Sequence, residues 1–399
     1  MPMKHGRSNI DVPSPEDPTS CGGYTGFNSL DLQQIYRVEK LPAFRSQIAR
    51  GYGKPVVARM PDGELLATGF YTHPADDEYV YPDGTSAHSG PWWITEEAAV
   101  MRSDDEGKTW SAPRHLGIPG RPTQFTCLSD GALIMAAGDG LYRSTNRGIV
   151  WNRCEVAWEG FATSDQQARG YGETNGVVAL SDGTLTYCCF AHRSPMKTVY
   201  DWNAYLIRST DGGKTWGDAT FMVHTDEISC ILLPNGKLLG FARVDTMYAR
   251  DIWGITDQTG EGGDTVTIIE SEDQGRTWTQ PRRIELGMAQ VPAFPLYLPD
   301  GRLLLIYGNR QFPFGGQAIA SRDLGRTWDL DHPIVLSWFS WDNYGGHPRS
   351  MLMPDGSILT GYYVRMFKED PKVTDDLVSH IVRWRVPEDW PGEMVGDGR

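Results

Sequence analysis

The stretch Ser209-Thr210-Asp211-Gly212-Gly213-Lys214-Thr215-Trp216 decides the fold, because its pattern Ser-x-Asp-x-Gly-x-Thr-Trp recurs along the chain. Three further complete copies begin at Ser103, Ser271 and Ser321, and a degenerate copy begins at Ser144. We expect the aspartate to accept hydrogen bonds from turn amides, the glycine to be left-handed and the tryptophan to pack the turn onto a neighbouring sheet. These turns therefore predict structure and not catalysis.

A second repeat alternates with the first and predicts β-hairpins. Two short apolar strands flank each of six two-residue turns, Asp62-Gly63, Asp130-Gly131, Asp182-Gly183, Asn235-Gly236, Asp300-Gly301 and Asp355-Gly356. Asp-Gly and Asn-Gly supply the positive φ that tight hairpins require. The turns are 68, 52, 53, 65 and 55 residues apart, about the length that a four-stranded sheet with its loops occupies.

Composition excludes several classes of protein. The chain has 399 residues, 40% of them hydrophobic and 11% aromatic, which is enough for a packed core. Its 45 glycines and 26 prolines follow no collagen period, so we interpret them as turn residues. The formal net charge of -14 repels nucleic acid and anionic membranes, and we expect neither as a partner. No apolar run approaches the roughly 18 residues that span a bilayer.

The N-terminal segment and the cysteines bear on the compartment. The first residues contain no apolar stretch of the kind that a secretory signal requires, so we expect a cytoplasmic protein, with a secreted mature fragment as the alternative. The six cysteines lack paired metal-ligand spacing. Adjacent Cys188 and Cys189 are expected to point to opposite faces of a strand as reduced core thiols.

Together the two repeats resemble the sialidase (neuraminidase) superfamily, whose β-propellers carry the eight-residue turn as the Asp box, or BNR repeat. The resemblance covers roughly residues 33–386 and implies an all-β, six-bladed β-propeller of four-stranded antiparallel blades. We expect an irregular arm over residues 1–30, one propeller over 31–390 and a tail over 391–399.

The ends of the chain are expected to complete the ring. Residues 34–38 are the candidate strand by which a terminus closes it, and residues 380–385 are the candidate outer strand of the last blade.

Topology places the candidate site on one rim of this propeller. In a four-stranded meander the hairpin turn and the Asp-box turn lie on the same rim, so the first strands start and the second strands end on the other. Ligands of propellers usually bind near the axis. Four of the six second strands end in an arginine, and arginine forks suit a carboxylate; these residues are Arg193, Arg243, Arg310 and Arg365, with Arg121 before a first strand.

One segment is similar to the sialidases beyond the turns. Residues 226–243 resemble the family stretch in which a glutamate partners the nucleophilic tyrosine and an arginine on the next strand binds the sugar carboxylate. The resemblance implies that Glu227 is the base and Arg243 the second carboxylate-binding arginine. The family's first arginine is replaced here by Lys54, which supplies charge without the bidentate fork, and Arg310 and Arg365 compete for the third position.

The nucleophile and the acid are less well matched. Counting eight residues back from Asp355 reaches His347, whereas Tyr344 lies three residues earlier, so either is a candidate. Asp76 and Asp77 are the candidate acids in the enlarged loop after the first blade's second strand. Glu173 is a further acid or base candidate without a close family counterpart.

These residues predict a sialidase-like exo-glycosidase that hydrolyses a terminal acidic sugar with retention and without metal or organic cofactor. Its expected partner is an anionic carbohydrate, and the oligomeric state is left open. One alternative is another carbohydrate-active enzyme on this frame, a uronic-acid or deoxy-sugar glycosidase or lyase using His347, Tyr344 or Glu173. Another is a non-catalytic glycan-binding propeller.

Overall fold

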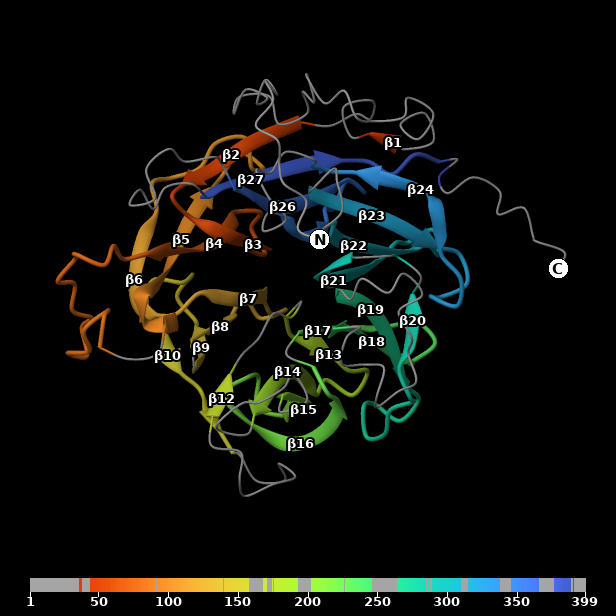
Figure 1. Cartoon of the computed structure of the whole chain (residues 1–399), viewed down its shortest axis with the longest axis horizontal. Coiled ribbons are helices and arrows are strands. Elements are labelled where there is room, and N and C mark those ends of the chain that lie inside the picture. The colour runs from red at the N-terminus through yellow and green to blue at the C-terminus, as the bar shows by residue number, and fades with distance from the viewer. Residues whose placement is uncertain are drawn as a thin grey trace, which may run out of the picture.

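The computed structural model of the chain describes residues 36–37, 44–89, 92–138, 140–157, 168–170, 174, 176–192, 202–225, 227–245, 264–284, 286, 289–309, 315–337, 346–365, 377–388 and 390. The strands form six sheets around a central axis, so the chain is a six-bladed β-propeller (Figure 1). The fold class predicted from the repeated turns is therefore confirmed. Within these ranges no helix has the length and hydropathy needed to cross a membrane.

Each blade is an antiparallel meander that begins at the axis, and the first three blades follow the predicted hairpins. Blade 1 consists of β3 (Gly53–Arg59), β4 (Leu65–Thr72), β5 (Glu96–Ser103) and β6 (Arg114–Pro119). Blade 2 consists of β7 (Pro122–Cys127), β8 (Leu133–Ala137), β9 (Gly140–Ser144) and β10 (Asn152–Arg153). Blade 3 consists of the short segments β12 (Ala168–Gly170) and β13 (Val178–Ala179), then β14 (Leu185–His192), β15 (Trp202–Ser209) and β16 (Thr215–Val223).

The last three blades repeat the plan. Blade 4 consists of β17 (Ile228–Leu232), β18 (Leu238–Asp245), β19 (Asp264–Ser271) and β20 (Arg282–Ile284). Blade 5 consists of β21 (Ala289–Tyr297), β22 (Leu303–Asn309), β23 (Gly315–Ser321) and β24 (Asp329–Val335). Blade 6 consists of β25 (Gly346–Leu352), β26 (Ile358–Arg365), β27 (Leu377–Trp384) and β2 (Phe44–Arg50). Outer edges also carry β1 (Tyr36–Arg37) and β11 (Glu155–Val156), and η2 (Trp92–Thr95) precedes β5.

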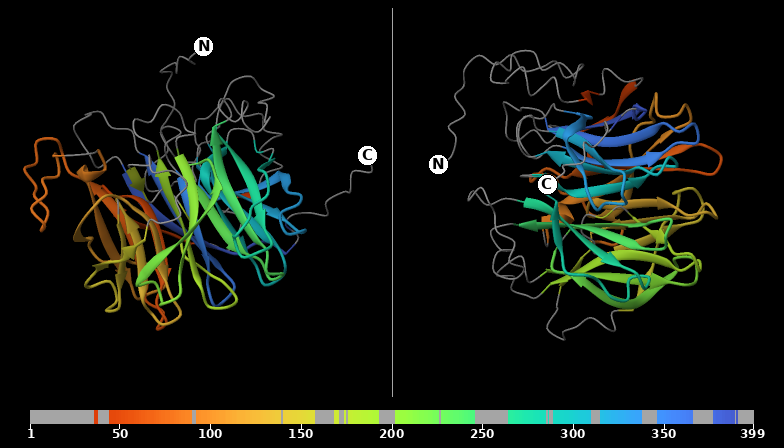
Figure 2. Two further views of the ribbon diagram at one scale, coloured as in Figure 1. Left: turned by 90° about the horizontal axis from the view of Figure 1, so that it is seen from below. Right: turned by 90° about the vertical axis from the view of Figure 1, so that its right-hand side faces the viewer.

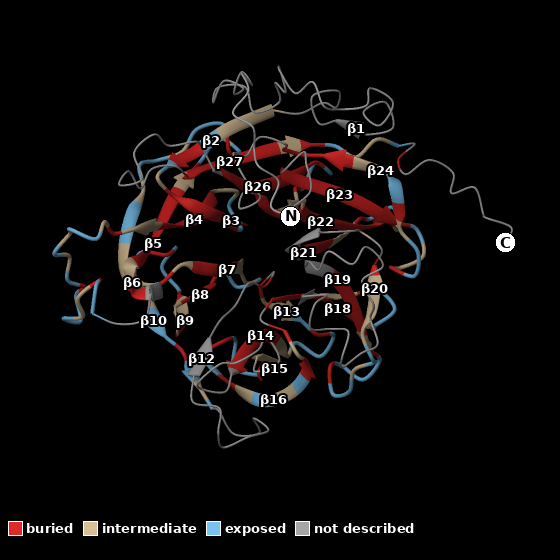
Figure 3. Ribbon diagram, viewed as in Figure 1, coloured by how far each residue is buried: buried red, intermediate tan, exposed pale blue. Residues whose placement is uncertain are grey.

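The core lies between neighbouring blades, and the described strands near the axis are largely buried (Figure 3). Leu65 and Met101 of blade 1 pack in one cluster with Ile381 of blade 6, whereas Leu66 packs in another with Leu133 of blade 2. Because successive strand residues point to opposite faces, adjacent leucines serve the two different interfaces. Each described sheet therefore buries both of its faces, and its stability depends on having a blade on either side.

The eight-residue turns contain the hydrogen bonds expected from their sequence. In the copy at Ser209, Asp211 Oδ1 accepts from the Thr215 amide at 3.0 Å and Oδ2 accepts from the Thr215 hydroxyl at 2.8 Å. Gly213 has a φ of 82°, and Trp216, 2% exposed, donates through Nε1 to the Gly213 carbonyl. In the degenerate copy, the amide oxygen of Asn146 accepts from the Val150 amide at 2.8 Å, so asparagine retains part of the pattern.

Arginines just before these turns join one blade to the next. Arg143 Nε donates to the Gly212 carbonyl of blade 3 at 3.0 Å, and Arg208 Nη2 donates to the Gln274 carbonyl of blade 4 at 3.2 Å. Arg102 donates in the same way to the Arg147 carbonyl of blade 2. The accepting residue precedes the motif glycine and is left-handed in each case, with φ values of 74°, 59° and 63°. The left-handed turn therefore presents its carbonyl to the neighbouring blade.

The N-terminal strand β2 closes the ring. It pairs antiparallel with β27, with Phe44 opposite Arg383, and forms the outer strand of blade 6 (Figure 1). Closure by a terminus is confirmed, but the expected closing strand over residues 34–38 is wrong, because Tyr36 and Arg37 pair with β24 of blade 5. The expected outer strand over residues 380–385 is also wrong, since β27 is the third strand. The polar run Arg45–Gln47 interrupts the alternation of apolar and polar residues, so the sequence does not identify β2 as a strand.

The cysteines behave as core residues. Cys188 lies in the cluster shared by blades 3 and 4, and Cys189 lies in the cluster shared by blades 2 and 3. Their side chains therefore point to opposite faces of β14, as expected. None of the five cysteines in the described part of the chain is in a disulfide.

The two rims of the ring differ in construction. The hairpin and eight-residue turns lie together on one rim, where Arg147 of a blade 2 turn binds Asp62 of the blade 1 hairpin at 2.6 Å. We call this the turn rim. The first strands start, and the second strands end, at the opposite edge, which we call the strand-start rim; strands run between the two rims in the side views (Figure 2).

Closure by β2 is tested by Ile48→Ala. Ile48 is 6% exposed and packs with Leu65 and Ile381, so truncation leaves a cavity where the first and last parts of the chain meet. We expect the free energy of unfolding to fall by about 2–4 kcal/mol in denaturant titrations. Ile149→Ala, at a site 57% exposed, is the matched control and should change it by less than about 0.5 kcal/mol. Equal effects of the two substitutions would contradict this closure.

The blade-to-blade arginines are tested by Arg208→Met. Arg208 is 6% exposed and also donates to the Asp218 carbonyl and to the Thr220 hydroxyl, both at 2.8 Å. Methionine keeps the volume but leaves buried acceptors without a donor, so we expect a loss of about 2–4 kcal/mol in the free energy of unfolding. Arg326→Met on an exposed turn position should be nearly neutral. A neutral Arg208→Met would show that the blades do not depend on this contact.

Candidate active site

Buried polar residues occupy equivalent places at the strand-start rim. Counting eight residues back from the hairpin turn reaches Lys54 in blade 1, Thr174 in blade 3, Glu227 in blade 4 and His347 in blade 6. Lys54 is 6% exposed, Glu227 8% and His347 3%. A propeller does not need a buried lysine, glutamate and histidine for its core, so this ring of positions is the first place to look for function.

Lys54 and His347 share an unusual backbone. Their φ values are 50° and 43°, in the left-handed region that non-glycine residues seldom adopt. Each lies in a first strand whose pairing with the second strand shifts register at that point. Such bulges redirect side chains and are frequent beside active sites. Because β3 and β25 contact each other, Lys54 and His347 lie near the starts of neighbouring first strands.

The structure brings the candidate residues Glu227 and Arg243 into contact with each other. Arg243 Nη1 lies 3.1 Å from Glu227 Oε1, and the two side chains are 20% and 11% exposed. The backbone supports the pair, because the Arg243 amide donates to the Glu227 carbonyl at 2.9 Å. Thr225 adds hydroxyl bonds to the carbonyls of both residues, at 3.0 and 2.7 Å. These hydrogen bonds therefore fix the pair at the strand-start rim of blade 4.

Arg121 is also placed at this rim, but it is bound to Glu96. Its Nε and Nη2 donate to the two carboxylate oxygens at 2.6 and 2.5 Å, and its guanidinium lies 5.0 Å from the centre of the Phe70 ring. Both partners are mostly buried, with side chains 17% and 7% exposed. A bidentate pair of this kind is fixed in place. Arg121 is therefore part of the wall of the rim, because Glu96 already binds its guanidinium.

The two candidate acids have different surroundings. Asp76 is exposed, whereas the carboxylate of Asp77 lies 2.9 Å from His73 Nδ1. The other ring nitrogen of His73 lies 3.1 Å from Glu97. Sequence reasoning missed Glu97, although a signal was present: Glu96 and Glu97 are adjacent in one strand, so one had to face each side of the blade.

The remaining candidates cannot be placed in the site. Tyr344, Glu173, Arg310 and Arg193 lie outside the described residues, and for Arg365, which ends β26, the backbone alone is described. These assignments stay predictions. Among the residues that are described, no group of three or more His, Cys, Asp or Glu side chains is arranged to hold a metal ion.

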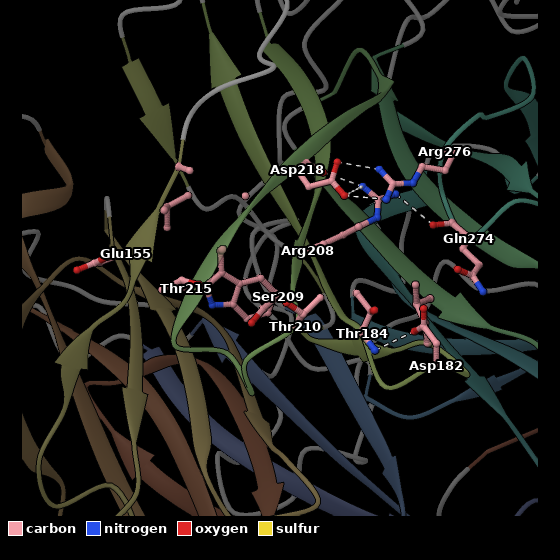
Figure 4. Close-up of a pocket in the computed structure, with 15 residues that line it drawn as sticks. Glu155, Asp182, Thr184, Arg208, Ser209, Thr210, Thr215, Asp218, Gln274 and Arg276 are labelled. Atoms are coloured by element: carbon pink, nitrogen blue, oxygen red, sulfur yellow. Dashed lines mark hydrogen bonds and ion pairs between the residues drawn. The ribbon is translucent and has the colours of Figure 1, made fainter.

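A groove of about 550 Å³ lies at the turn rim between blades 3 and 4 (Figure 4). In it, Arg276 Nη2 lies 2.7 Å from the Asp218 carboxylate, and Arg208 donates to the Gln274 carbonyl. These are contacts that join two blades. The groove is therefore explained by the architecture and does not replace the strand-start rim as the candidate site.

Comparison with known proteins places the chain among the repeat propellers. Residues 131–311 match the family model described as BNR repeat-like domain. Curated relatives include xyloglucanase Xgh74A of Acetivibrio thermocellus, 29% identical over 214 residues, and a sialidase of Clostridium perfringens, 23% identical over 200 residues. These matches cover 46% and 42% of this chain, and 24% and 50% of the two relatives, so the chain spans half of their length or less.

Solved structures share the fold over most of the chain. A protein of unknown function from Dyadobacter fermentans has a TM-score of 0.63 at 21% identity, covering 86% of this chain and 98% of its own. The GH93 alpha-L-arabinofuranosidase of Fusarium graminearum has 0.58 at 14%, covering 85% and 97%, and the NanB sialidase from Streptococcus pneumoniae has 0.54 at 13%, covering 86% and 70%. At these identities the likeness concerns the fold. Residues 131–311 thus match a BNR repeat-like domain, and the chain as a whole has a six-bladed β-propeller fold similar to these structures.

Proposed function

We propose that the chain is a glycoside hydrolase that acts on a terminal anionic sugar at the strand-start rim. The observation that carries the proposal is the Glu227–Arg243 pair, held 3.1 Å apart in a largely buried position where two strands meet. The names of its relatives support the reaction class, since a xyloglucanase, a sialidase and an arabinofuranosidase all hydrolyse glycosidic bonds. A scaffold would be more stable with apolar residues at these positions.

In the proposed mechanism Arg243 binds the substrate carboxylate, and Lys54 supplies the second positive charge that a sialidase obtains from arginine. Glu227 accepts the proton of Tyr344, which then attacks the anomeric carbon and forms a covalent glycosyl intermediate with retention. An acid from the loop after β4, Asp76, protonates the departing oxygen. Water then attacks the anomeric carbon and gives a proton to Asp76, while Glu227 returns its proton to the departing Tyr344 oxygen.

A second candidate uses His347 in place of Tyr344. It is favoured by the position of His347, which occupies the strand-start place directly, is 3% exposed and has a left-handed φ of 43°. An imidazole there acts as acid or base at neutral pH. This variant of the site suits a uronic-acid glycosidase or lyase, whose substrate also carries a carboxylate that Arg243 can bind.

The first experiment measures fluorophore release from a fluorogenic N-acetylneuraminic acid glycoside and from a matched glucuronide. We expect turnover of the sialoside, with kcat/KM reduced about 10²–10⁴-fold by Glu227→Ala and about 10–150-fold by Arg243→Ala. Glu270→Ala is the matched control, because Glu270 pairs with Lys237 at 2.8 Å in the same blade but away from this rim. Turnover of the glucuronide alone, lost in His347→Ala, would select the second candidate. Turnover of neither substrate by the folded protein would contradict both.

Lys54 provides a separate prediction. If its charge binds the substrate carboxylate, Lys54→Met should raise KM about tenfold or more while kcat changes little, because uniform binding is lost. Lys54→Arg should retain most of the affinity. The measurement is the steady-state kinetics of the three proteins on the better substrate. An unchanged KM in Lys54→Met would remove Lys54 from the site.

A further inference from the structure

A buried carboxylate in blade 1 connects two parts of the candidate site that are far apart in the sequence. Glu97 is the second residue of β5, and its side chain is 1% exposed. Six rings from β4, β6 and the adjoining loops lie around it: Tyr52, Tyr71, His73, Tyr79, Tyr81 and His115. A carboxylate buried this deeply must be compensated by hydrogen bonds.

Both oxygens of Glu97 are fully engaged. Oε2 lies 3.1 Å from His73 Nε2 and 2.9 Å from His115 Nδ1, while Oε1 accepts from the Gly117 amide at 2.8 Å and from the Tyr79 hydroxyl at 3.3 Å. Burial raises the pKa of Glu97, but the hydrogen bonds from His115, Gly117 and His73 outweigh it and hold the pKa below its ordinary 4.5. The group is therefore an anion at neutral pH and accepts from both histidines.

The first branch leads from Glu97 to the loop after β4. His73 is buried, stacks on Tyr79 with ring centres 4.1 Å apart, and lies 2.9 Å from Asp77 through Nδ1. Its two ring nitrogens therefore lie between the carboxylates of Asp77 and Glu97. The His73 amide also donates to the Thr95 carbonyl at the far end of the loop. This branch therefore holds the loop that carries Asp76 against blade 1.

The second branch leads from Glu97 to the first strand of the ring. His115 Nδ1 donates to Glu97, so its Nε2 is the acceptor for the Tyr52 hydroxyl at 2.7 Å. Burial, together with Tyr71 and Glu97, raises the pKa of Tyr52 to about 12, so the phenol keeps the proton that it donates. Tyr52 stands two residues before Lys54, and its carbonyl accepts from Ser379 of blade 6 at 2.6 Å.

We propose that Glu97 is a positioning residue that sets, through His73 and His115, the places of the Asp76 loop and of Lys54. The link to catalysis rests on the proposed function, whereas the mechanical coupling does not. One anion thereby fixes two segments, residues 73–89 and 52–58, that are not adjacent in the sequence. The titratable or charged groups that face this cluster are Asp77, Tyr52, Tyr71, Tyr79, Tyr81, His73 and His115, and Glu96 binds Arg121 on the other face of β5.

The coupling has a defined pH dependence. Because the pKa of Glu97 is lower in the folded chain than in the unfolded one, its contribution is complete above about pH 4.5 and is lost as the pH falls through the folded-state value. Acid should therefore loosen residues 52–58 and 73–89 together. Glu97→Gln removes this shared acid step, because the amide does not titrate and its NH₂ group faces a donor in either orientation, the histidines or the Gly117 amide.

The test is hydrogen–deuterium exchange of the full chain at neutral pH, resolved by peptide. In Glu97→Gln we expect exchange to rise about tenfold or more in both segments and to stay unchanged in blade 4. Glu64→Gln is the matched control, since Glu64 binds Arg102 at 2.9 Å in the same blade at the turn rim. Loosening of one segment alone, or a uniform rise across the chain, would overturn the proposal.

Two milder variants separate the branches and guard against a failure of Glu97→Gln to fold. Tyr52→Phe should loosen residues 52–58 and leave 73–89 protected, and His73→Gln should do the reverse. Nitrogen-15 spectra add a signature that a merely structural role does not predict: in the parent, His115 should carry a proton on Nδ1, the nitrogen that faces Glu97. An Nδ1 without a proton would contradict the assignment. If the exchange data hold while no sugar is cleaved, the proposed function fails and the coupling stands.

Discussion

The antiparallel ladder between β2 and β27 is the contact on which the rest of the molecule depends. It joins Phe44 to Arg383 and so ties the beginning of the described chain to its end. Every blade buries two apolar faces, and an open arc would leave one face of blade 1 and one face of blade 6 in water. Closing the ring removes both exposed faces at once. The arginines that reach the next turn then add polar contacts between neighbours at the turn rim.

This construction separates structure from chemistry. The turn rim is built from repeated motifs whose aspartates accept hydrogen bonds within the turn, and the groove there between blades 3 and 4 contains the Arg276–Asp218 ion pair. At the strand-start rim the blades differ from one another. Equivalent places hold a lysine, a threonine, a glutamate and a histidine, two of them with left-handed backbones. The repeat thus supplies a rigid ring, and the departures from the repeat supply the groups that can bind and react.

The sequence predicts most of the fold and part of the site. The Ser-x-Asp turns and the Asp-Gly hairpins predict six blades because both signals are local, and the pairing of Glu227 with Arg243 follows because one hairpin joins them. The closing strand was missed, since Arg45–Gln47 gives no apolar alternation and its partner lies more than 300 residues away. Glu97 was missed for a related reason: its partners at positions 73 and 115 meet it through tertiary packing alone. Arg121, expected to bind substrate, is held by Glu96, which no spacing rule shows.

The central claim is that an anionic sugar binds at the strand-start rim beside Arg243. The most direct measurement is a crystal structure of the Glu227→Gln variant with a sialoside bound. The account predicts the sugar carboxylate within hydrogen-bond distance of Arg243, with Lys54 and the loop carrying Asp76 around the same ring. Density for the sugar at the turn rim instead, in the groove lined by Arg208 and Arg276, would contradict it.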